Sequence, residues 1–183
     1  MSGPADYASQ FNPGFRLDPA KVALVVVDMQ YASASRHEGL GRLLKDQGQP
    51  EQGAARFDRI ESVVVPTIRR LLAFFRARGL RIVYLTVGSE MPDFSDLPAH
   101  MRPMAEAVGN TRGRREHEIL DALTPRPDEP VPTTTTMSAC HSSGFERLVR
   151  AWGVSASRIS CSRRPRVLPT ASAIGRMWGG RSL

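Results

Sequence analysis

The chain has 183 residues, two cysteines and a formal net charge of +7, a length that suits one globular domain with its own core. No apolar run approaches the roughly 20 residues needed to cross a bilayer, and the N-terminus lacks the pattern of a signal peptide. These features exclude a membrane span and predict a cytoplasmic protein without disulfides.

The positive charge is concentrated at the C-terminus. Residues 155–183 hold six arginines and no acidic residue, whereas the rest of the chain holds 19 basic and 18 acidic residues. The globular part is therefore nearly neutral, which argues against nucleic-acid binding and predicts a solvated, disordered end. We expect an N-terminal arm at residues 1–20, a domain at residues 21–160 and an atypical basic tail at residues 161–183.

The first predicted strand is the apolar run Val22–Val27, which leads directly into Asp28. A short run rich in β-branched residues is typical of a strand that is covered on both faces of a parallel sheet. Ligands of such sheets bind beyond the carboxyl ends of the strands. Asp28 is therefore the first candidate for chemistry, and the alternative is a carboxylate that only caps the following turn.

A long connection at residues 31–56 follows, with room for a short helix at Leu40–Asp46. Apolar residues at helical spacing then predict a helix over Phe57–Arg78, in which Pro66 either causes a kink or begins a new helix. The second strand is Leu80–Thr86. Because a helix separates the two strands, they should be parallel and joined by a right-handed crossover.

The second half of the chain is less regular. Residues 87–115 form a long loop with several prolines, of the kind that often has a function. The remaining predicted elements are a short helix at 116–123, a weak third strand at 130–132, a helix at 143–152 with a capping box at Ser143 and Glu146, and a fourth strand at 158–161.

Four segments, at residues 23–30, 81–88, 114–120 and 135–144, are similar in order and spacing to those of the isochorismatase-like cysteine hydrolases. The resemblance extends over residues 15–154. It implies a three-layer α/β fold with a parallel sheet, and hydrolysis of a small-molecule amide, as in nicotinamidases and N-carbamoylsarcosine amidases.

The resemblance also implies a mechanism that uses an Asp, a Lys and a Cys at three strand ends. The Asp takes the proton of the thiol, the thiolate attacks the amide carbon, and a cation favours the thiolate. Carried over by position, the Asp is Asp28, whereas the Lys position holds Thr134.

The cysteine position of the family is also altered. Aligning Val167 and the pair Thr170-Ala171 with the family places Arg166 there, and Cys161 lies about five residues earlier. Cys161 is the possible nucleophile. Cys140 stands where relatives usually have Phe, and the alternative for both thiols is a small buried side chain.

After Ser160 the chain is enriched in Arg, Pro and Gly and has no apolar periodicity, so the sheet is expected to be truncated after its fourth strand. A shifted reading frame near the codons of that strand would produce such a change, and a sheet that stops there would leave an apolar edge uncovered.

No cofactor and no metal site are predicted. His100 and His117 lack the paired spacing of metal ligands and are expected on the surface or in the core. The resemblance implies a small-molecule substrate, no membrane partner and, for an intact fold, a homo-oligomer.

Two functions follow. The first is an amidohydrolase with Asp28 as base and residues 87–115 covering the substrate. The second is a catalytically inactive relative, either a binding or oligomerisation module or the product of a disrupted gene. A branch of the family that cleaves the vinyl ether of isochorismate works without the Cys, so the missing thiol alone does not separate the two.

Overall fold

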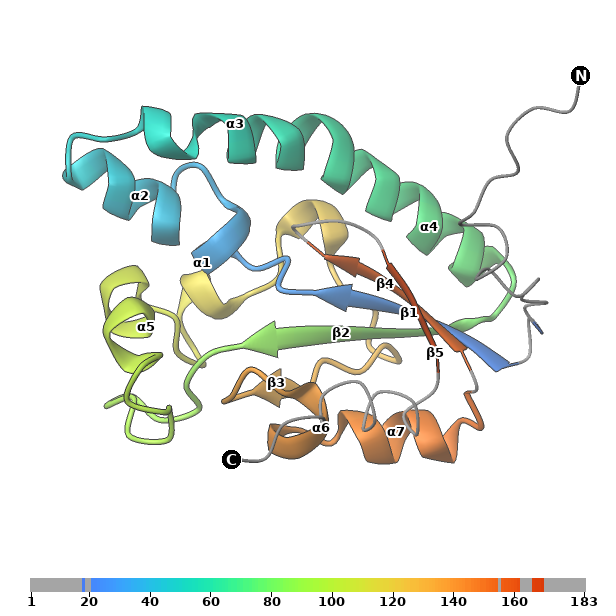
Figure 1. Cartoon of the computed structure of the whole chain (residues 1–183). Coiled ribbons are helices and arrows are strands. Elements are labelled where there is room, and N and C mark those ends of the chain that lie inside the picture. Colours follow the sequence, from blue (N-terminus) through green and yellow to red (C-terminus); the bar gives the residue numbers. More distant parts are fainter. Residues whose placement is uncertain (1–17, 19–20, 155, 162–165, 170–183) are drawn as a thin grey trace, which may run out of the picture.

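The structure, a computed structural model, describes residue 18 and residues 21–154, 156–161 and 166–169. Within these residues one five-stranded sheet lies between two layers of helices (Figure 1). The strand order is β3-β2-β1-β4-β5, with the bounds Thr133–Thr134, Arg81–Val87, Val22–Val27, Ala156–Cys161 and Arg166–Pro169. The predicted α/β class with a parallel sheet is confirmed.

The central strand β1 pairs in parallel with β2 on one side and β4 on the other. The side chains of Ala23–Val26 are 0% exposed, as expected for an apolar run covered on both faces. Because β2 and β3 are also parallel, the carboxyl ends of β1 to β4 lie along one edge of the sheet. This edge is where the sequence places Asp28.

Alternate residues of β1 belong to different cores. Leu24 and Val26 pack with Ile68 and Leu72 of α4 (Val65–Ala77) on one face. On the other face, Val25 packs with the helix α7 (Phe145–Ala151), which lies below the sheet in Figure 1. The alternation follows from the two-residue period of a strand.

The helices α3 (Glu51–Arg59) and α4 run as one rod across the sheet, joined by a π-helical turn at Ile60–Val64 (Figure 1). Pro66 lies in the first turn of α4, as one of the two alternatives predicted, but the helical conformation does not begin there, because Val64 has φ and ψ of −70° and −52°. The proline, which has no N–H, directly follows the π-helical turn. The short helix α2 (Gly39–Asp46) confirms the prediction for Leu40–Asp46, and α1 (Tyr31–Ala34) precedes it.

The predicted loop at 87–115 contains a helix, α5 (Arg102–Val108), which the sequence analysis missed. Pro103 suggested a loop, because proline interrupts helices, but proline is favoured in the first turn of a helix. Gly109 ends α5 with a φ of 73°, in the left-handed region that glycine adopts without strain.

The prediction of a helix at residues 116–123 is wrong. Two short 3-10 turns, Arg115–His117 and Asp121–Leu123, enclose an extended segment that pairs with the chain after β1. Leu120 N donates to Met29 O at 2.9 Å, and this tertiary pairing competes with helix formation. The third strand lies at 133–134 rather than 130–132, because Pro130 and Pro132 have no N–H to donate and offer only their carbonyls to β2.

The predicted capping box does not form. The Oγ of Ser143 accepts from Phe145 N at 3.3 Å and donates to the carbonyl of Ala139 in the helix α6 (Ala139–Ser142). The carboxylate of Glu146 instead accepts from Arg150, at 2.6 Å. The residue that caps α7 is Gly144.

The strand β4 starts two residues earlier than predicted, and β5 pairs with it in antiparallel register from Ala156↔Pro169 to Ile159↔Arg166. The strand β5 lies in the basic tail, where no regular structure was expected from the sequence. An antiparallel pair needs only a short connection, and only residues 162–165 separate the two strands. The N-terminal arm except Asp18, and most of the expected tail, lie outside the described residues.

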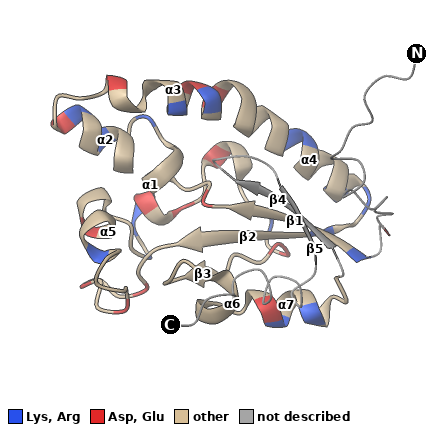
Figure 2. Ribbon diagram, viewed as in Figure 1, with Lys and Arg blue, Asp and Glu red and all other residues tan. Residues whose placement is uncertain are grey.

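Among the coloured residues of Figure 2, the charged ones lie mainly on the helices and loops around the sheet, and β1 contains none. No helix in the described part of the chain is both long and apolar enough to cross a membrane.

Candidate active site

A cleft of about 640 Å³ opens at the carboxyl ends of the parallel strands. Strand ends form its floor, and residues of α5 and of the preceding loop form an apolar wall, which includes Leu97, Met101, Met104, Ala105 and Val108. Asp28 and Thr134 both line the cleft, so the fold brings these two predicted positions together.

Asp28 stands at the end of β1 with a φ of 55°, in the left-handed region that is uncommon for residues other than glycine. Two contacts fix its backbone. Its N–H donates to Leu85 O at 2.9 Å, and its carbonyl accepts from Ser33 Oγ at 2.6 Å. Backbone strain of this kind concentrates at functional sites, where the surrounding structure holds it in place.

Thr134 is 6% exposed, and its hydroxyl is directed back into the sheet. Its Oγ1 donates to Thr86 O at 3.1 Å, and its carbonyl accepts from Gly88 N at 3.0 Å. The position that carries Lys in the resembling family therefore holds a neutral group with a hydrogen bond of its own.

The two cysteines lie in different places. Cys161 is the last residue of β4, and its backbone is in register with Val27, the residue before Asp28. Cys140 lies in α6 and packs against the core around Val25. Burial, followed by the negative charge of Glu146, raises the pKa of the Cys140 thiol. Arg166 begins β5, where its backbone pairs with Ile159.

Arg56 of α3 also lines the cleft, and the sequence analysis did not identify it. Its guanidinium donates from two nitrogens to Ser33 O, at 3.0 and 3.3 Å. Ser33 in turn donates to the backbone carbonyl of Asp28, so Ser33 links the guanidinium of Arg56 to the backbone of Asp28. The exposed imidazole of His100 lies on the same cleft.

A buried polar network supports the strand ends from behind. Gln30, 0% exposed, accepts from Val87 N at 2.9 Å and donates to His117 O at 2.8 Å. Asn110 donates to Val87 O at 2.7 Å, and its Oδ1 lies 2.9 Å from His117 Nδ1. These contacts tie the end of β1 to β2 and to the segment after α5.

The imidazole of His117 is neutral in this network, because burial, and then the positive charge of Arg112, lower its pKa to about 4. Since Asn110 Oδ1 can only accept, the proton is assigned to Nδ1 of His117. Nε2 then accepts from Thr133 Oγ1, at 3.3 Å. Of the two places expected for His117, the surface and the core, the structure shows the core.

Comparison with known proteins identifies the family. The model of the isochorismatase domain matches residues 22–159. The chain belongs to the isochorismatase family.

Two curated relatives named ureidoacrylate amidohydrolase RutB have similar sequences. The protein from Caulobacter segnis is 28% identical over 152 residues, which are 75% of this chain and 59% of that protein. The one from Pseudomonas syringae pv. syringae is 29% identical over 155 residues, 76% and 58% of the two chains. This isochorismatase-family chain therefore spans about three fifths of the length of these relatives.

Solved structures of the family share the fold. A cysteine hydrolase from Pseudomonas syringae pv. phaseolicola gives a TM-score of 0.60 at 23% identity, covering 80% of this chain and 62% of its own. An isochorismatase family protein from Desulfovibrio vulgaris gives 0.56 at 25% identity, with coverages of 74% and 63%. N-carbamoylsarcosine amidase from Thermoplasma acidophilum gives 0.51 at 20% identity, with coverages of 77% and 67%.

For this isochorismatase-family chain, a search for clusters of three or more His, Cys, Asp or Glu side chains that could hold a metal ion finds none among the described residues. The charged or polar side chains that line the cleft include those of Asp28, Arg56, His100 and Thr136.

Proposed function

We propose that this chain binds a small-molecule amide in the cleft and hydrolyses its C–N bond, with Asp28 as the proton acceptor. The observation that carries the proposal is an aspartate with a left-handed backbone that lines a cleft of about 640 Å³ at the carboxyl ends of parallel strands. Membership of a hydrolase family, and the amide substrate in the names of the two curated relatives, support the choice of reaction.

The proposed nucleophile is the thiol of Cys161. Asp28 takes the thiol proton, the thiolate attacks the carbonyl carbon, and the C–N bond breaks as the nitrogen receives that proton. Water then hydrolyses the acyl thioester to release the acid. The register of β4 supports this choice, since the backbone of Cys161 lies beside the residue that precedes Asp28.

Turnover should be slow, because the cleft lacks a cation at position 134. A free thiol has a pKa of about 8.5 and needs nearby positive charge to ionise at neutral pH. Thr134 supplies none, because its hydroxyl is neutral, and this hydroxyl already donates to Thr86 O. By analogy with the loss of one oxyanion donor, the rate should lie roughly 10²- to 10³-fold below that of an enzyme with the complete triad.

The lack of a cation at position 134 also favours a second candidate function, which is binding of the amide without turnover. The cleft and its apolar wall do not depend on a cation, whereas activation of a thiol does. The two functions share a ligand and differ only in whether product forms.

Titration calorimetry and ammonia release, measured on the full chain with ureidoacrylate and N-carbamoylsarcosine, separate these functions. Hydrolysis predicts binding together with slow ammonia release that is lost in Asp28→Asn and Cys161→Ser but kept in the matched variants Asp46→Asn and Cys140→Ser. Asp46 is exposed and Cys140 lies outside the cleft. Binding without ammonia supports the second function, and no binding of either amide overturns both.

A further inference from the structure

One face of a single helix contributes most of the apolar wall of the cleft. Between residues 97 and 108, every residue that lines the cleft is apolar except His100. Four of them occur at the spacing i, i+3, i+4 and i+7, which places them on the same side of a helix. They are Met101, directly before α5, and Met104, Ala105 and Val108 within it. We call these four residues the α5 stripe.

The α5 stripe runs from the floor of the cleft toward its mouth. Asn110, which follows α5 closely, donates to Val87 O at 2.7 Å, so the C-terminal end of the helix is held at the strand ends. In Figure 1, α5 lies beyond the carboxyl end of β2. Val108 is 6% exposed, whereas Met104, one helical turn earlier, is 57% exposed. Met101 precedes Val108 by roughly 10 Å along the helix axis.

Charged groups reach the cleft from other elements. Asp28 follows β1, and Arg56 belongs to α3. The charged residues of α5 itself do not line the cleft. One of these, Arg102, donates instead to the carbonyls of Phe94 and Leu97, at 3.1 Å each. The cleft therefore combines a reactive end at Asp28 with a wall that offers an apolar surface.

The exposed part of this wall is suited to contact with a ligand. A ligand that covers Met104 removes apolar area from water, which favours binding. The methionine side chain is unbranched and flexible, so it adapts to groups of different shape. A polar ligand would leave the same surface hydrated. The α5 stripe thus favours a ligand with an apolar part long enough to extend from the floor to the mouth.

We propose that the amide bound in the cleft carries an extended apolar group, such as an alkyl chain, that packs along the α5 stripe while its carboxamide lies at Asp28. This inference rests on the proposed function and names the class of its substrate. Ureidoacrylate and N-carbamoylsarcosine carry short groups that end in a carboxylate, so they leave the stripe uncovered. The chain should therefore bind longer apolar amides more tightly than these compounds.

The test is an NMR titration of the full chain with propanamide and hexanamide, which have the same carboxamide and differ by three methylene groups. Full burial of one methylene corresponds to about a fourfold gain in affinity. Because Met104 leaves part of the wall open to water, hexanamide should bind at least about tenfold more tightly. Met104→Gln should reduce this advantage at least about threefold, whereas Met104→Leu should keep it.

The matched control is Met91→Gln, since Met91 is 49% exposed but does not line the cleft. It should keep the full advantage of hexanamide. Equal affinity for the two amides, no binding of hexanamide, or an equal loss in Met91→Gln would overturn the inference.

Ammonia release, measured on the same samples, separates this inference from the proposed function. Chain-length-dependent binding without ammonia supports the α5 stripe as a binding surface and contradicts turnover. Ammonia release from both amides with equal affinities supports hydrolysis and overturns the apolar substrate class.

Discussion

Acidification should destabilise the protein through His117. Burial, and then the charge of Arg112, lower the pKa of this imidazole from 6.5 to about 4 in the folded chain. The unfolded chain therefore binds more protons than the folded one between these two values. Stability from this residue is fully present above pH 6.5 and is lost as the pH falls toward 4.

The size of the effect follows from the two pKa values. Each pKa unit corresponds to about 1.4 kcal/mol, so a separation of about 2.5 units predicts a loss of about 3 kcal/mol between pH 7 and pH 4. Because the side chain is only 9% exposed, solvent screening reduces this value little. Carboxylates also titrate in this range, so the contribution of His117 must be isolated by comparison with a variant.

Urea unfolding of the unmodified chain and of His117→Gln, measured between pH 7 and pH 4, isolates that contribution. Glutamine keeps hydrogen-bonding groups but does not titrate, so the carboxylate effects cancel in the difference. The stability advantage of the unmodified chain should shrink by about 3 kcal/mol as the pH falls. His37→Gln, at an exposed site, shows the effect of losing a surface imidazole. An advantage that stays constant or grows on acidification would refute the reasoning.

Three further predictions concern single substitutions. Gly88→Ala should lower the unfolding free energy, measured with urea, by about 2 to 4 kcal/mol. The new Cβ would lie 2.7 Å from Asn110 Oδ1 and 2.8 Å from His117 Nδ1, at a φ of 150°. A loss of less than about 1 kcal/mol would contradict this, because it would mean that the side chains of Asn110 and His117 move aside. Glu129→Gln should lower the unfolding free energy by about 3 kcal/mol, since it leaves the guanidinium of Arg76 without its negatively charged partner, and an unchanged value would contradict this. Thr134→Lys should raise the rate of ammonia release at neutral pH at least about tenfold, by favouring the thiolate, whereas Thr134→Met should not.

Local patterns predicted the part of the fold that positions the site. The apolar run of β1 identified both the strand and Asp28 at its end. Both can be predicted from the sequence because they depend on a few residues that are adjacent in the chain. The periodicity of residues 57–78 likewise identified the rod that crosses the sheet, although not its π-helical turn.

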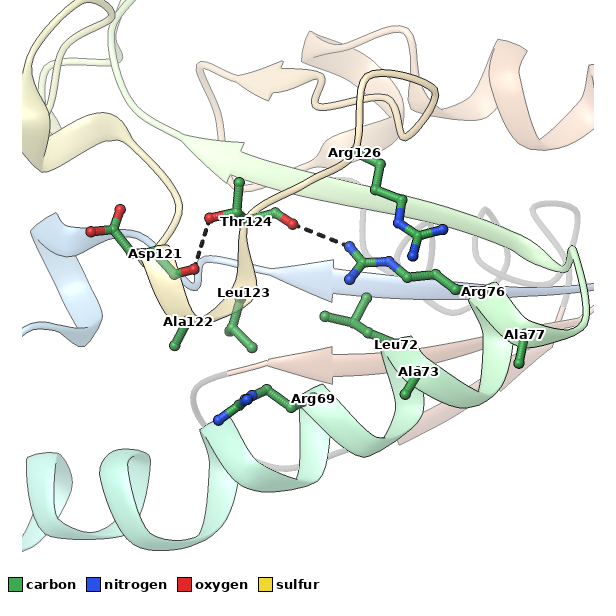
Figure 3. A pocket seen from close by; sticks show the side chains of 10 residues that line it. All are labelled: Arg69, Leu72, Ala73, Arg76, Ala77, Asp121, Ala122, Leu123, Thr124 and Arg126. Carbon is green, nitrogen blue, oxygen red and sulfur yellow. Dashed lines mark hydrogen bonds between the residues drawn. The ribbon is translucent and has the colours of Figure 1, made fainter.

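Features that depend on distant residues could not be predicted in this way. The network around His117 joins residues 30, 86, 110, 117 and 133, and no local pattern links them. The hollow between α4 and residues 121–126 (Figure 3) combines a helix with a loop about 50 residues later. The extended segment between the 3-10 turns Arg115–His117 and Asp121–Leu123 replaces a predicted helix, because its backbone pairs with the chain after β1.

The most direct test of the central claim is the rate of ammonia release from ureidoacrylate by Asp28→Asn, measured beside Asp46→Asn. Asparagine tolerates the left-handed backbone at position 28, so the substitution removes the base and keeps the local conformation. If Asp28 is the proton acceptor of the cleft, its variant should be slower by about 10²-fold or more, while Asp46→Asn keeps the unmodified rate. Equal rates in the two variants would contradict the assignment of Asp28 and of the cleft.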